Sequence, residues 1–288
     1  EGVAVRAVLQ ICHGVAEHIA RYDGFARALN EQGIVVAGHD HLGHGKSLPE
    51  GGTPVYFGQG STWNTVVDDI YILHQRLKQR YPDVPLCIMG HSMGSFLTRT
   101  YLIRYPGTVK AAVIMGTGWQ PRAAITGGLA LANAIAAVSG ENATSELVTE
   151  LAFGSYNKLF APNRTKVDWL SADESNVDDY IADPLCGADA TVGLFRQMLH
   201  GIRFNQRQSH LRQMDREMPV LFVAGDKDPV GSCGKGVRQT YDAFRAAGMR
   251  DCTLKLYPGL RHEILNEKAY TADITKNIEA WLLSRLEK

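Results

Sequence analysis

Short apolar runs alternate with amphipathic stretches along most of the chain. The apolar runs have the length of buried strands and cover residues 7–12, 34–37, 86–89, 109–115, 220–224 and 253–257. Apolar residues spaced three and four apart predict helices over 21–32, from Ser61 or Thr62 onward, and over 93–105, 235–247 and 273–286. Strands that alternate with helices form right-handed βαβ units, so the pattern predicts an α/β fold with a mostly parallel sheet.

The alternation stops between residues 119 and 212. This stretch is alanine-rich at 123–137, polar and acidic at 171–179, and has no clear buried strand. We therefore predict one α/β core, formed by residues 1–118 and 213–288, with a helical cap inserted at 119–212.

A Gly-x-Ser-x-Gly sequence lies between the third strand and its helix. It reads Gly90-His91-Ser92-Met93-Gly94. On a tight strand-to-helix turn, a serine hydroxyl projects clear of the backbone, and the glycines allow strand and helix to approach closely. The N–H of Met93 would lie beside that hydroxyl, at the electropositive end of the helix. The context predicts that Ser92 is a nucleophile.

A serine nucleophile needs a base and a carboxylate that orients the base. The loop after strand 220–224 carries Asp226 and Asp228, and the loop after strand 253–257 carries His262. Both loops follow the carboxyl ends of strands, as Ser92 does, so they are expected at the same edge of the sheet. Pro229 favours an extended Asp228, which suits a side chain aimed across the top of the sheet.

Together these segments make the chain similar to a known family. It resembles the α/β-hydrolases of the monoacylglycerol lipase and lysophospholipase kind, also described as serine aminopeptidase-like. The segments that carry the resemblance are His13-Gly14-Val15-Ala16-Glu17-His18, Asp40-His41-Leu42-Gly43-His44-Gly45-Lys46-Ser47, the serine turn, Gly225-x-x-Asp228 and His262.

The resemblance implies roles for individual residues. The family's acid stands three residues after the glycine that ends its strand, which favours Asp228 over Asp226. The segment His13-Gly14 would be the oxyanion loop, beside the substrate, with Val15 giving a second backbone N–H next to that of Met93. We expect the His13 ring itself to be packed and hydrogen-bonded, and Glu17 and His18 to brace the loop.

Composition narrows the function and the location. Thirty basic and thirty acidic residues give no net charge, which does not favour nucleic-acid binding. The five cysteines are scattered, odd in number and without a Cys-x-x-Cys pair, which indicates free thiols in a reducing compartment. No run of about 18 apolar residues or signal peptide is evident. We expect a cytoplasmic enzyme that needs no cofactor.

One histidine-rich segment allows a different interpretation. His39-Asp40-His41-Leu42-Gly43-His44 approaches the His-x-His-x-Asp-His pattern of metal-dependent hydrolases. Gly43 stands where a metal-binding aspartate would be, so we expect this segment to shape a loop and expect no metal.

The start of the chain departs from the family pattern. Family members usually begin with an antiparallel strand pair, whereas six residues precede Ala7 here. Either the pair has been truncated or this sheet edge is abbreviated.

The activity we expect is hydrolysis of an acyl ester with one chain, such as a monoacylglycerol or lysophospholipid. An apolar stretch at 127–138 could offer Leu129 and Ile135 to the acyl chain, or touch a lipid surface, or only pack on the core. A short-chain esterase, a thioesterase or an amidase could use the same triad. A ligand-binding protein without activity is the alternative from another class.

Overall fold

The computed structural model describes residues 4–286. Six strands form one sheet in the order β2-β1-β3-β4-β5-β6, and each neighbouring pair is parallel. They are β1 (Ala7–Cys12), β2 (Ile34–Gly38), β3 (Leu86–His91), β4 (Ala112–Met115), β5 (Val220–Gly225) and β6 (Cys252–Tyr257). The predicted α/β fold is confirmed. The strand expected at 109–115 is shorter and begins at Ala112, and the apolar residues Val109 and Ala111 are buried in the connection that precedes it.

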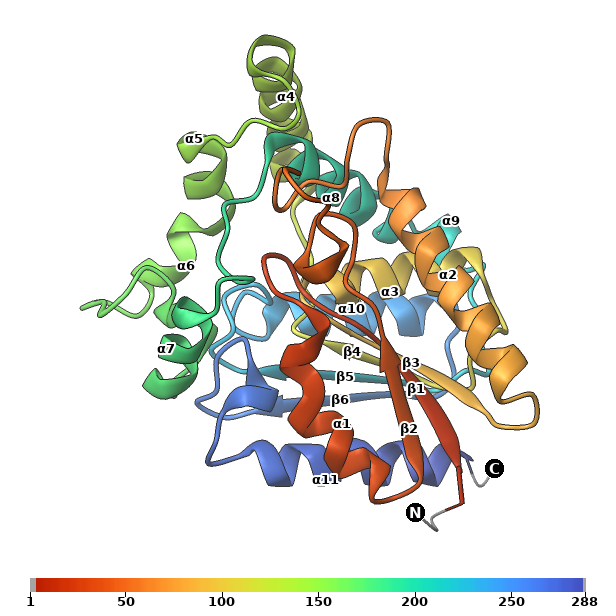
Figure 1. Ribbon diagram of the computed structural model, residues 1–288. Coiled ribbons are helices and arrows are strands. Elements are labelled where there is room, and N and C mark those ends of the chain that lie inside the picture. Colours follow the sequence, from red (N-terminus) through yellow and green to blue (C-terminus); the bar gives the residue numbers. More distant parts are fainter. Residues whose placement is uncertain (1–3, 287–288) are drawn as a thin grey trace.

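Helices cover both faces of the sheet (Figure 1). Helices α1 (Asp23–Asn30) and α11 (Thr271–Leu286) pack on one face, against strand residues such as Leu9 and Val113. Helices α2 (Trp63–Arg80), α3 (Met93–Arg104) and α10 (Lys235–Ala247) pack on the other face, against residues such as Ile88 and Phe222. Alternate strand residues therefore face opposite halves of the core.

The structure changes one predicted helix start and decides between two residues for another. The helix expected at 21–32 is split into a 3-10 turn, Ile19–Tyr22, and α1. The start of α2 is capped by Thr62, whose side chain exchanges hydrogen bonds with Thr65 and leaves Ser61 outside the cap.

The segment between β4 and β5 is built from helices and turns. Its helices are α4 (Arg122–Ser139), α5 (Glu146–Thr149), α6 (Ser155–Lys158), α7 (Glu174–Ala182), α8 (Val192–Asn205) and α9 (Gln208–Leu211), with a π-helical turn at Glu150–Gly154 and a 3-10 turn at Asp168–Leu170. In Figure 1 this segment lies above the carboxyl ends of the strands, and α4 points away from the sheet.

Helix α8 joins the segment firmly to the core. The Asn205 side chain donates to the Phe96 carbonyl at 2.8 Å and accepts from Thr100 at 2.8 Å. Helix α8 also packs closely on α2, because a Cβ on Gly201 of α8 would lie 2.1 Å from the Trp63 ring of α2. Because α8 covers its outer side, α3 is buried almost all round, whereas the sequence pattern predicted one apolar face.

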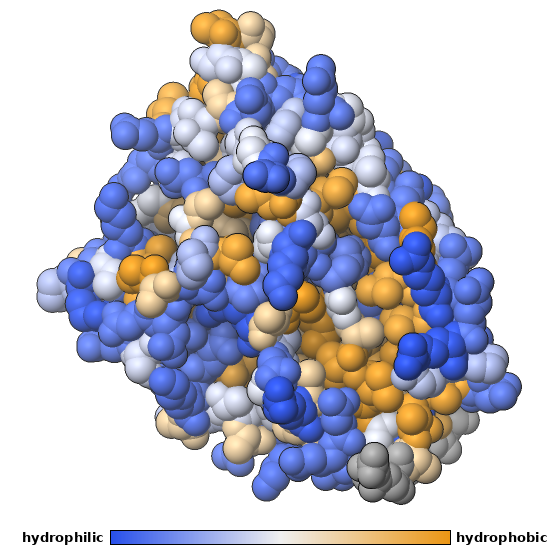
Figure 2. All heavy atoms as spheres, viewed as in Figure 1, coloured by the Kyte–Doolittle hydropathy of each residue, from blue (hydrophilic) through white to orange (hydrophobic). Residues whose placement is uncertain are grey.

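Helix α4 is more exposed than the other long helices. By length and composition it is the one helix of residues 4–286 that could cross a membrane, and 17% of it is buried. The polar residues Arg122, Thr126 and Ser139 lie outside the apolar stretch at 127–138 that the sequence pattern suggested, and α4 includes them. Val138, near its far end, is 88% exposed, and Figure 2 shows apolar side chains at this tip of the molecule.

The sheet edge at β2 presents partly exposed apolar residues. Val35 and Val36 are half-buried, and Figure 2 shows apolar surface beside β1 and β2. Within residues 4–286, no antiparallel strand precedes β1.

Candidate active site

The predicted nucleophile lies on a tight turn between β3 and α3. Ser92 has a φ of 53° and a ψ of −121°, a conformation that residues with side chains rarely adopt. Its N–H donates to the Met115 carbonyl at 3.1 Å, and its carbonyl accepts from the N–H and hydroxyl of Ser95. These bonds hold the strained turn, from which Ser92 faces a cavity.

Two glycines make this turn sterically possible. A Cβ on Gly90 would lie 2.2 Å from the Gly94 carbonyl oxygen, and a Cβ on Gly94 would lie 2.0 Å from the Cys12 carbonyl oxygen. Such distances are far inside van der Waals contact, so side chains are excluded at both positions. The Gly-x-Ser-x-Gly spacing therefore has a direct steric cause.

His262 and Asp228 lie together at the carboxyl ends of β6 and β5. The His262 Nδ1 is 3.0 Å from the Asp228 Oδ1, and the two side chains are 2% and 0% exposed. The same carboxylate oxygen accepts from the Val230 N–H at 2.9 Å. A carboxylate beside Nδ1 favours the tautomer with its proton there, which leaves Nε2 as the basic nitrogen.

Asp226, the rival candidate for the acid, has another partner. Its Oδ1 accepts from the Gly259 N–H at 2.8 Å, which ties the loop after β5 to the loop after β6. The structure thus brings Asp228, and not Asp226, to His262.

Two residues that line the cavity beside Ser92 have backbone N–H groups without an acceptor in the described part of the chain. They are Val15 and Met93, and within residues 4–286 no group accepts a hydrogen bond from either N–H. A Cβ on Gly14 would lie 3.1 Å from the Ser92 Cβ, so this loop runs directly past the nucleophile. Two free N–H donors at such a place can stabilise negative charge on a substrate oxygen.

A buried carboxylate, Glu17, holds the loop at His13-Gly14-Val15 in place through the Gly14 N–H. It accepts from the Gly14 N–H at 2.5 Å and the Tyr22 hydroxyl at 2.9 Å, and it contacts His91 Nδ1 at 3.3 Å and Arg21 at 2.9 Å. Burial alone would raise the pKa of Glu17, but the hydrogen bond with His91 and the charge of Arg21 hold this pKa well below its usual value. The ionised carboxylate therefore fixes the loop, which is the bracing role expected for it.

His13 belongs to the scaffold. Its ring is fully buried, Nε2 accepts from the His41 N–H at 2.9 Å, and Nδ1 lies 2.8 Å from the Gly14 carbonyl. Burial lowers the pKa of His13 to about 3, so the ring is neutral. The packed ring matches the expectation from the sequence. His13 is not among the residues that line the cavity, and its contact with substrate stays a prediction.

An apolar cavity of about 220 Å³ adjoins Ser92. None of its wall residues is charged, and its polar side chains besides Ser92 are Gln120, Ser155 and Tyr156. The apolar wall residues are Val15, Met93, Phe96, Ala124, Ile125, Leu151, Ala152, Phe153, Trp169, Phe195, Met198, Leu199, Ile202 and Val230. Such a site suits a chain of methylene groups.

The cap residues predicted to contact substrate do not line this cavity. Only the first turn of α4 reaches it, through Ala124 and Ile125. Leu129 is buried in the packing between α4 and α8, and Ile135 is half-buried further along the helix. In Figure 1, α4 extends away from the sheet.

Sequence reasoning missed the cap residues that hold the histidine loop. The Trp169 ring lies 5.1 Å from the His262 ring, centroid to centroid, and forms part of the cavity wall. Arg261 donates to the carbonyls of Asp168 at 2.5 Å and Ser171 at 3.0 Å, and the Glu263 N–H donates to the Leu170 carbonyl at 2.7 Å. The cap is therefore hydrogen-bonded to Arg261 and Glu263, the residues on either side of His262. A tryptophan in a polar stretch was the one sequence signal for this contact.

The histidine-rich segment forms a buried cluster of rings with His13. Ring centroids are 4.2 Å apart for His13 and His41 and 5.2 Å apart for His39 and His41. Within residues 4–286, the ligand atoms of this cluster do not converge on one point, unlike those of a separate group formed by His18, Asp183 and Cys186.

Known proteins share this arrangement over most of the chain. The family model for serine aminopeptidase, S33, matches residues 3–269. A monoacylglycerol lipase of Mycolicibacterium smegmatis is 32% identical over 98% of this chain and 89% of its own length, and the human monoglyceride lipase is 28% identical over 97% and 83%. The crystal structure of a thermostable carboxyl esterase from Bacillus coagulans, in complex with glycerol, matches with a TM-score of 0.92 at 26% identity, covering 99% of this chain and 91% of that one. The resemblance seen in the sequence is confirmed: the chain belongs to the serine aminopeptidase, S33, family and is a hydrolase of the monoacylglycerol lipase and esterase kind.

Proposed function

We propose that the protein hydrolyses carboxylic esters through an acyl-enzyme on Ser92. The observation that carries the proposal is the buried 3.0 Å contact between His262 and Asp228, together with Ser92, which is held at a φ of 53° and lines an apolar cavity. His262 would take the Ser92 proton as the hydroxyl attacks the ester carbonyl, and would return it to the leaving alcohol. The N–H groups of Val15 and Met93 would hold the oxyanion. Water then repeats the cycle on the acyl-enzyme, and the scheme uses no cofactor.

The cavity favours a substrate with one acyl chain and an uncharged head group. Its apolar walls fit a single chain, and its three neutral polar side chains, Gln120, Ser155 and Tyr156, could bond the hydroxyls of glycerol. A lysophospholipid carries a phosphate, which proteins usually pair with arginine or lysine, and none lines this cavity. We therefore favour a monoacylglycerol over a lysophospholipid.

The cap offers apolar side chains through which the enzyme could meet a lipid surface. Leu147, Leu151 and Leu159 are 54%, 61% and 61% exposed, and Val138 on α4 is 88% exposed. Leu151 is at once exposed and part of the cavity wall, so it marks the mouth of the cavity. An acyl chain could pass from a membrane or micelle to Ser92 along this route.

The cysteines support an intracellular place of action. All five are free, and two of them, Cys12 and Cys87, are buried. A protein without disulfides suits the reducing cytoplasm.

A panel of matched esters tests the substrate class. Glycerol esters of about two to sixteen carbons would be compared with lysophospholipids, thioesters and amides of equal chain length, and with a two-chain diacyl lipid. We expect kcat/KM to rise with chain length until the cavity is full, since each buried methylene is worth about 0.8 kcal/mol. We also expect the glycerol ester to be the best substrate at each length.

Different outcomes would support the rival functions. A rate that falls steadily from the shortest ester upward would indicate a short-chain esterase, and a preference for the thioester or the amide would indicate a thioesterase or an amidase. No turnover of any substrate, together with tight binding of one, would indicate a ligand-binding protein.

A further inference from the structure

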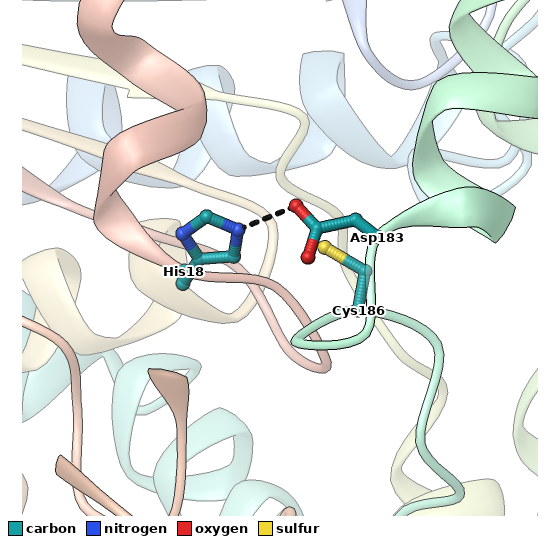
Figure 3. Close-up of side chains that lie close together, drawn as sticks. All are labelled: His18, Asp183 and Cys186. Carbon is teal, nitrogen blue, oxygen red and sulfur yellow. Dashed lines mark hydrogen bonds and ion pairs between the residues drawn. The ribbon is translucent and has the colours of Figure 1, made fainter. Parts of the chain in front are cut away.

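Three side chains converge at the joint between the oxyanion loop and the cap. They are His18, which follows the loop, and Asp183 and Cys186, which follow α7. The His18 Nε2 lies 2.8 Å from the Asp183 Oδ2, and one ligand atom from each of the three residues lies within 4.8 Å of the others. Figure 3 shows the thiol directed toward the space beside the imidazole and the carboxylate. Residues far apart in the chain thus bring one nitrogen, one oxygen and one sulfur ligand together.

We propose that His18, Asp183 and Cys186 form a binding site for a divalent cation of the zinc type. Imidazole, thiolate and carboxylate are the side chains that Zn²⁺ binds in proteins, often as three protein ligands with one position left for water. With bonds of about 2.0–2.3 Å in a tetrahedral arrangement, ligand atoms lie roughly 3.3–3.8 Å apart. The three groups need to close by about one ångström to reach this geometry. The cation takes the place of the proton on His18 Nε2, the neutral ring then carries its one proton on Nδ1, and the thiol releases its proton to solvent.

The charges of the group itself suit a cation. The Asp183 carboxylate lies against the His18 ring, and the nearby guanidinium of Arg21 is already paired with Glu17 and Glu263. A divalent ion would offset the charges of the Asp183 carboxylate and the Cys186 thiolate. The side chains of His18 and Asp183 are 11% and 29% exposed, so the site is largely enclosed on the ring side and open on the carboxylate side.

The position of this site gives a bound cation a structural consequence. The Ala16 carbonyl, one residue beyond Val15, accepts from the Gly187 N–H at 2.9 Å and from the Tyr180 hydroxyl at 2.9 Å. The cap segment at 183–187 therefore already contacts the loop. A cation bound to His18 and to this segment fastens the cap to the oxyanion loop by coordinate bonds in addition to these hydrogen bonds.

Cobalt absorption tests the site without reference to ester hydrolysis. The intact, metal-free protein is titrated with Co²⁺, which substitutes for Zn²⁺ and gives a thiolate-to-metal charge-transfer band when a cysteine is a ligand. We expect one equivalent of Co²⁺ to produce the band and one equivalent of Zn²⁺ to remove it. Cys186→Ser should abolish the band, whereas Cys252→Ser, at another partly buried thiol, should keep it.

Conservative variants separate coordination from a structural hydrogen bond. Asp183→Asn and His18→Gln can keep a hydrogen bond between these two positions, but amides are poor ligands for zinc. We expect both to lose the stoichiometric band while their circular dichroism matches that of the unaltered protein. A band of unchanged strength in Cys186→Ser, or no stoichiometric band in the unaltered protein, would overturn the proposal.

A second measurement needs no variant. Alkylation of each cysteine by iodoacetamide is followed by peptide mass spectrometry with and without Zn²⁺. At a Zn²⁺ concentration that fills about nine tenths of the site, the rate at Cys186 should fall roughly tenfold, by mass action. The exposed Cys233 should react at its former rate. Equal protection of both thiols would mean that the ion binds cysteines in general, and would also overturn the proposal.

Discussion

The core and the cap contribute to the site in opposite ways. In the core, Asp228 and His262 are almost fully buried and hydrogen-bonded, and Ser92 is held in a strained turn. In the cap, Leu151 and Leu159 are 61% exposed. Reacting atoms must be positioned to a fraction of an ångström, whereas an acyl chain needs only apolar area. Changes in the core should therefore alter the rate for all substrates, and changes in the cap should alter which substrate is preferred.

The largest effect is expected from removing the nucleophile. Ser92→Ala should lower kcat for every ester by about 10⁴ to 10⁶, because the triad acts as a unit. Mass spectrometry after treatment with a fluorophosphonate should show one adduct, on Ser92, in the unaltered protein and none in the variant. Labelling of another residue, or an active Ser92→Ala protein, would refute the serine mechanism.

The second-largest effect is expected from replacing the carboxylate that orients His262, and a neighbouring aspartate serves as the control. Asp228→Asn should lower kcat by about 10⁴, because the amide favours the wrong tautomer of His262. Asp226→Asn should cost less than about tenfold, since Asp226 bonds the Gly259 N–H and not the histidine. Steady-state kinetics of both variants on one ester decides between them. A larger loss in Asp226→Asn would reverse the assignment.

The histidine cluster should make the core sensitive to acid. Burial lowers the pKa values of His13, His41 and His44, and in His13 and His41 the neighbouring histidines lower them further, although Glu17 and Asp40 act in the other direction on His13. The unfolded chain binds these protons below about pH 6.5, and the folded protein does not. Stability should therefore be fully present above pH 6.5 and fall as the pH decreases from there toward the folded pKa values, by about 1.4 kcal/mol per pH unit for each such ring.

Urea denaturation between pH 7.5 and 5 measures how steeply the free energy of unfolding changes with pH. His91 does not contribute to this change below pH 6.5. Burial lowers the pKa of His91, but the hydrogen bond with Glu17 and the charges of Glu17 and Glu263 together outweigh burial and raise this pKa, so its stabilisation is lost only as the pH rises. His41→Leu removes one ring that takes up a proton on unfolding, so the free energy of unfolding should fall less steeply with decreasing pH, by about 1.4 kcal/mol per pH unit. The variant breaks no side-chain hydrogen bond, since neither ring nitrogen of His41 has a partner within residues 4–286. A free energy of unfolding that stays constant down to pH 5 would contradict the prediction.

The smallest effect is expected in the cap, and there it should depend on the substrate. Leu151→Glu places a carboxylate at the mouth of the cavity and should lower kcat/KM for a long-chain glycerol ester by roughly tenfold, with little effect on an acetyl ester. Leu159→Glu is the control, since Leu159 is equally exposed but does not line the cavity. Equal losses on short and long esters, or in both variants, would remove the distinction between core and cap.

The sequence was most informative where local spacing determines position. The glycines beside Ser92 leave no choice of residue, and Asp228 and His262 follow strands whose carboxyl ends meet at one edge of the sheet. The fold class and the family are confirmed, and the loops that carry these residues follow from the same strand pattern.

The cap was less predictable because its contacts connect residues distant in the chain. The apolar run around Leu129 suggested a wall of the substrate site, but the direction of α4 depends on its packing against α8, which no local spacing reveals. The contact of Trp169 with His262 and the pairing of His18 with Asp183 likewise depend on tertiary structure. In the core, the burial of α3 on almost all sides was also missed, since α8 supplies the second partner.

The hydrogen bonds between the cap and Arg261 and Glu263 affect how the cap of one such enzyme can be exchanged for that of another. Exchanging residues 119–212 for the cap of a relative would be a natural way to transfer substrate preference. The carbonyls of Asp168, Leu170 and Ser171 would be exchanged with it, although they hold the segment around His262. A chimera should keep its activity only if the donor cap presents carbonyls at these three places. The cap is thus not an independent module, and a junction placed to retain 168–171 would be the better design.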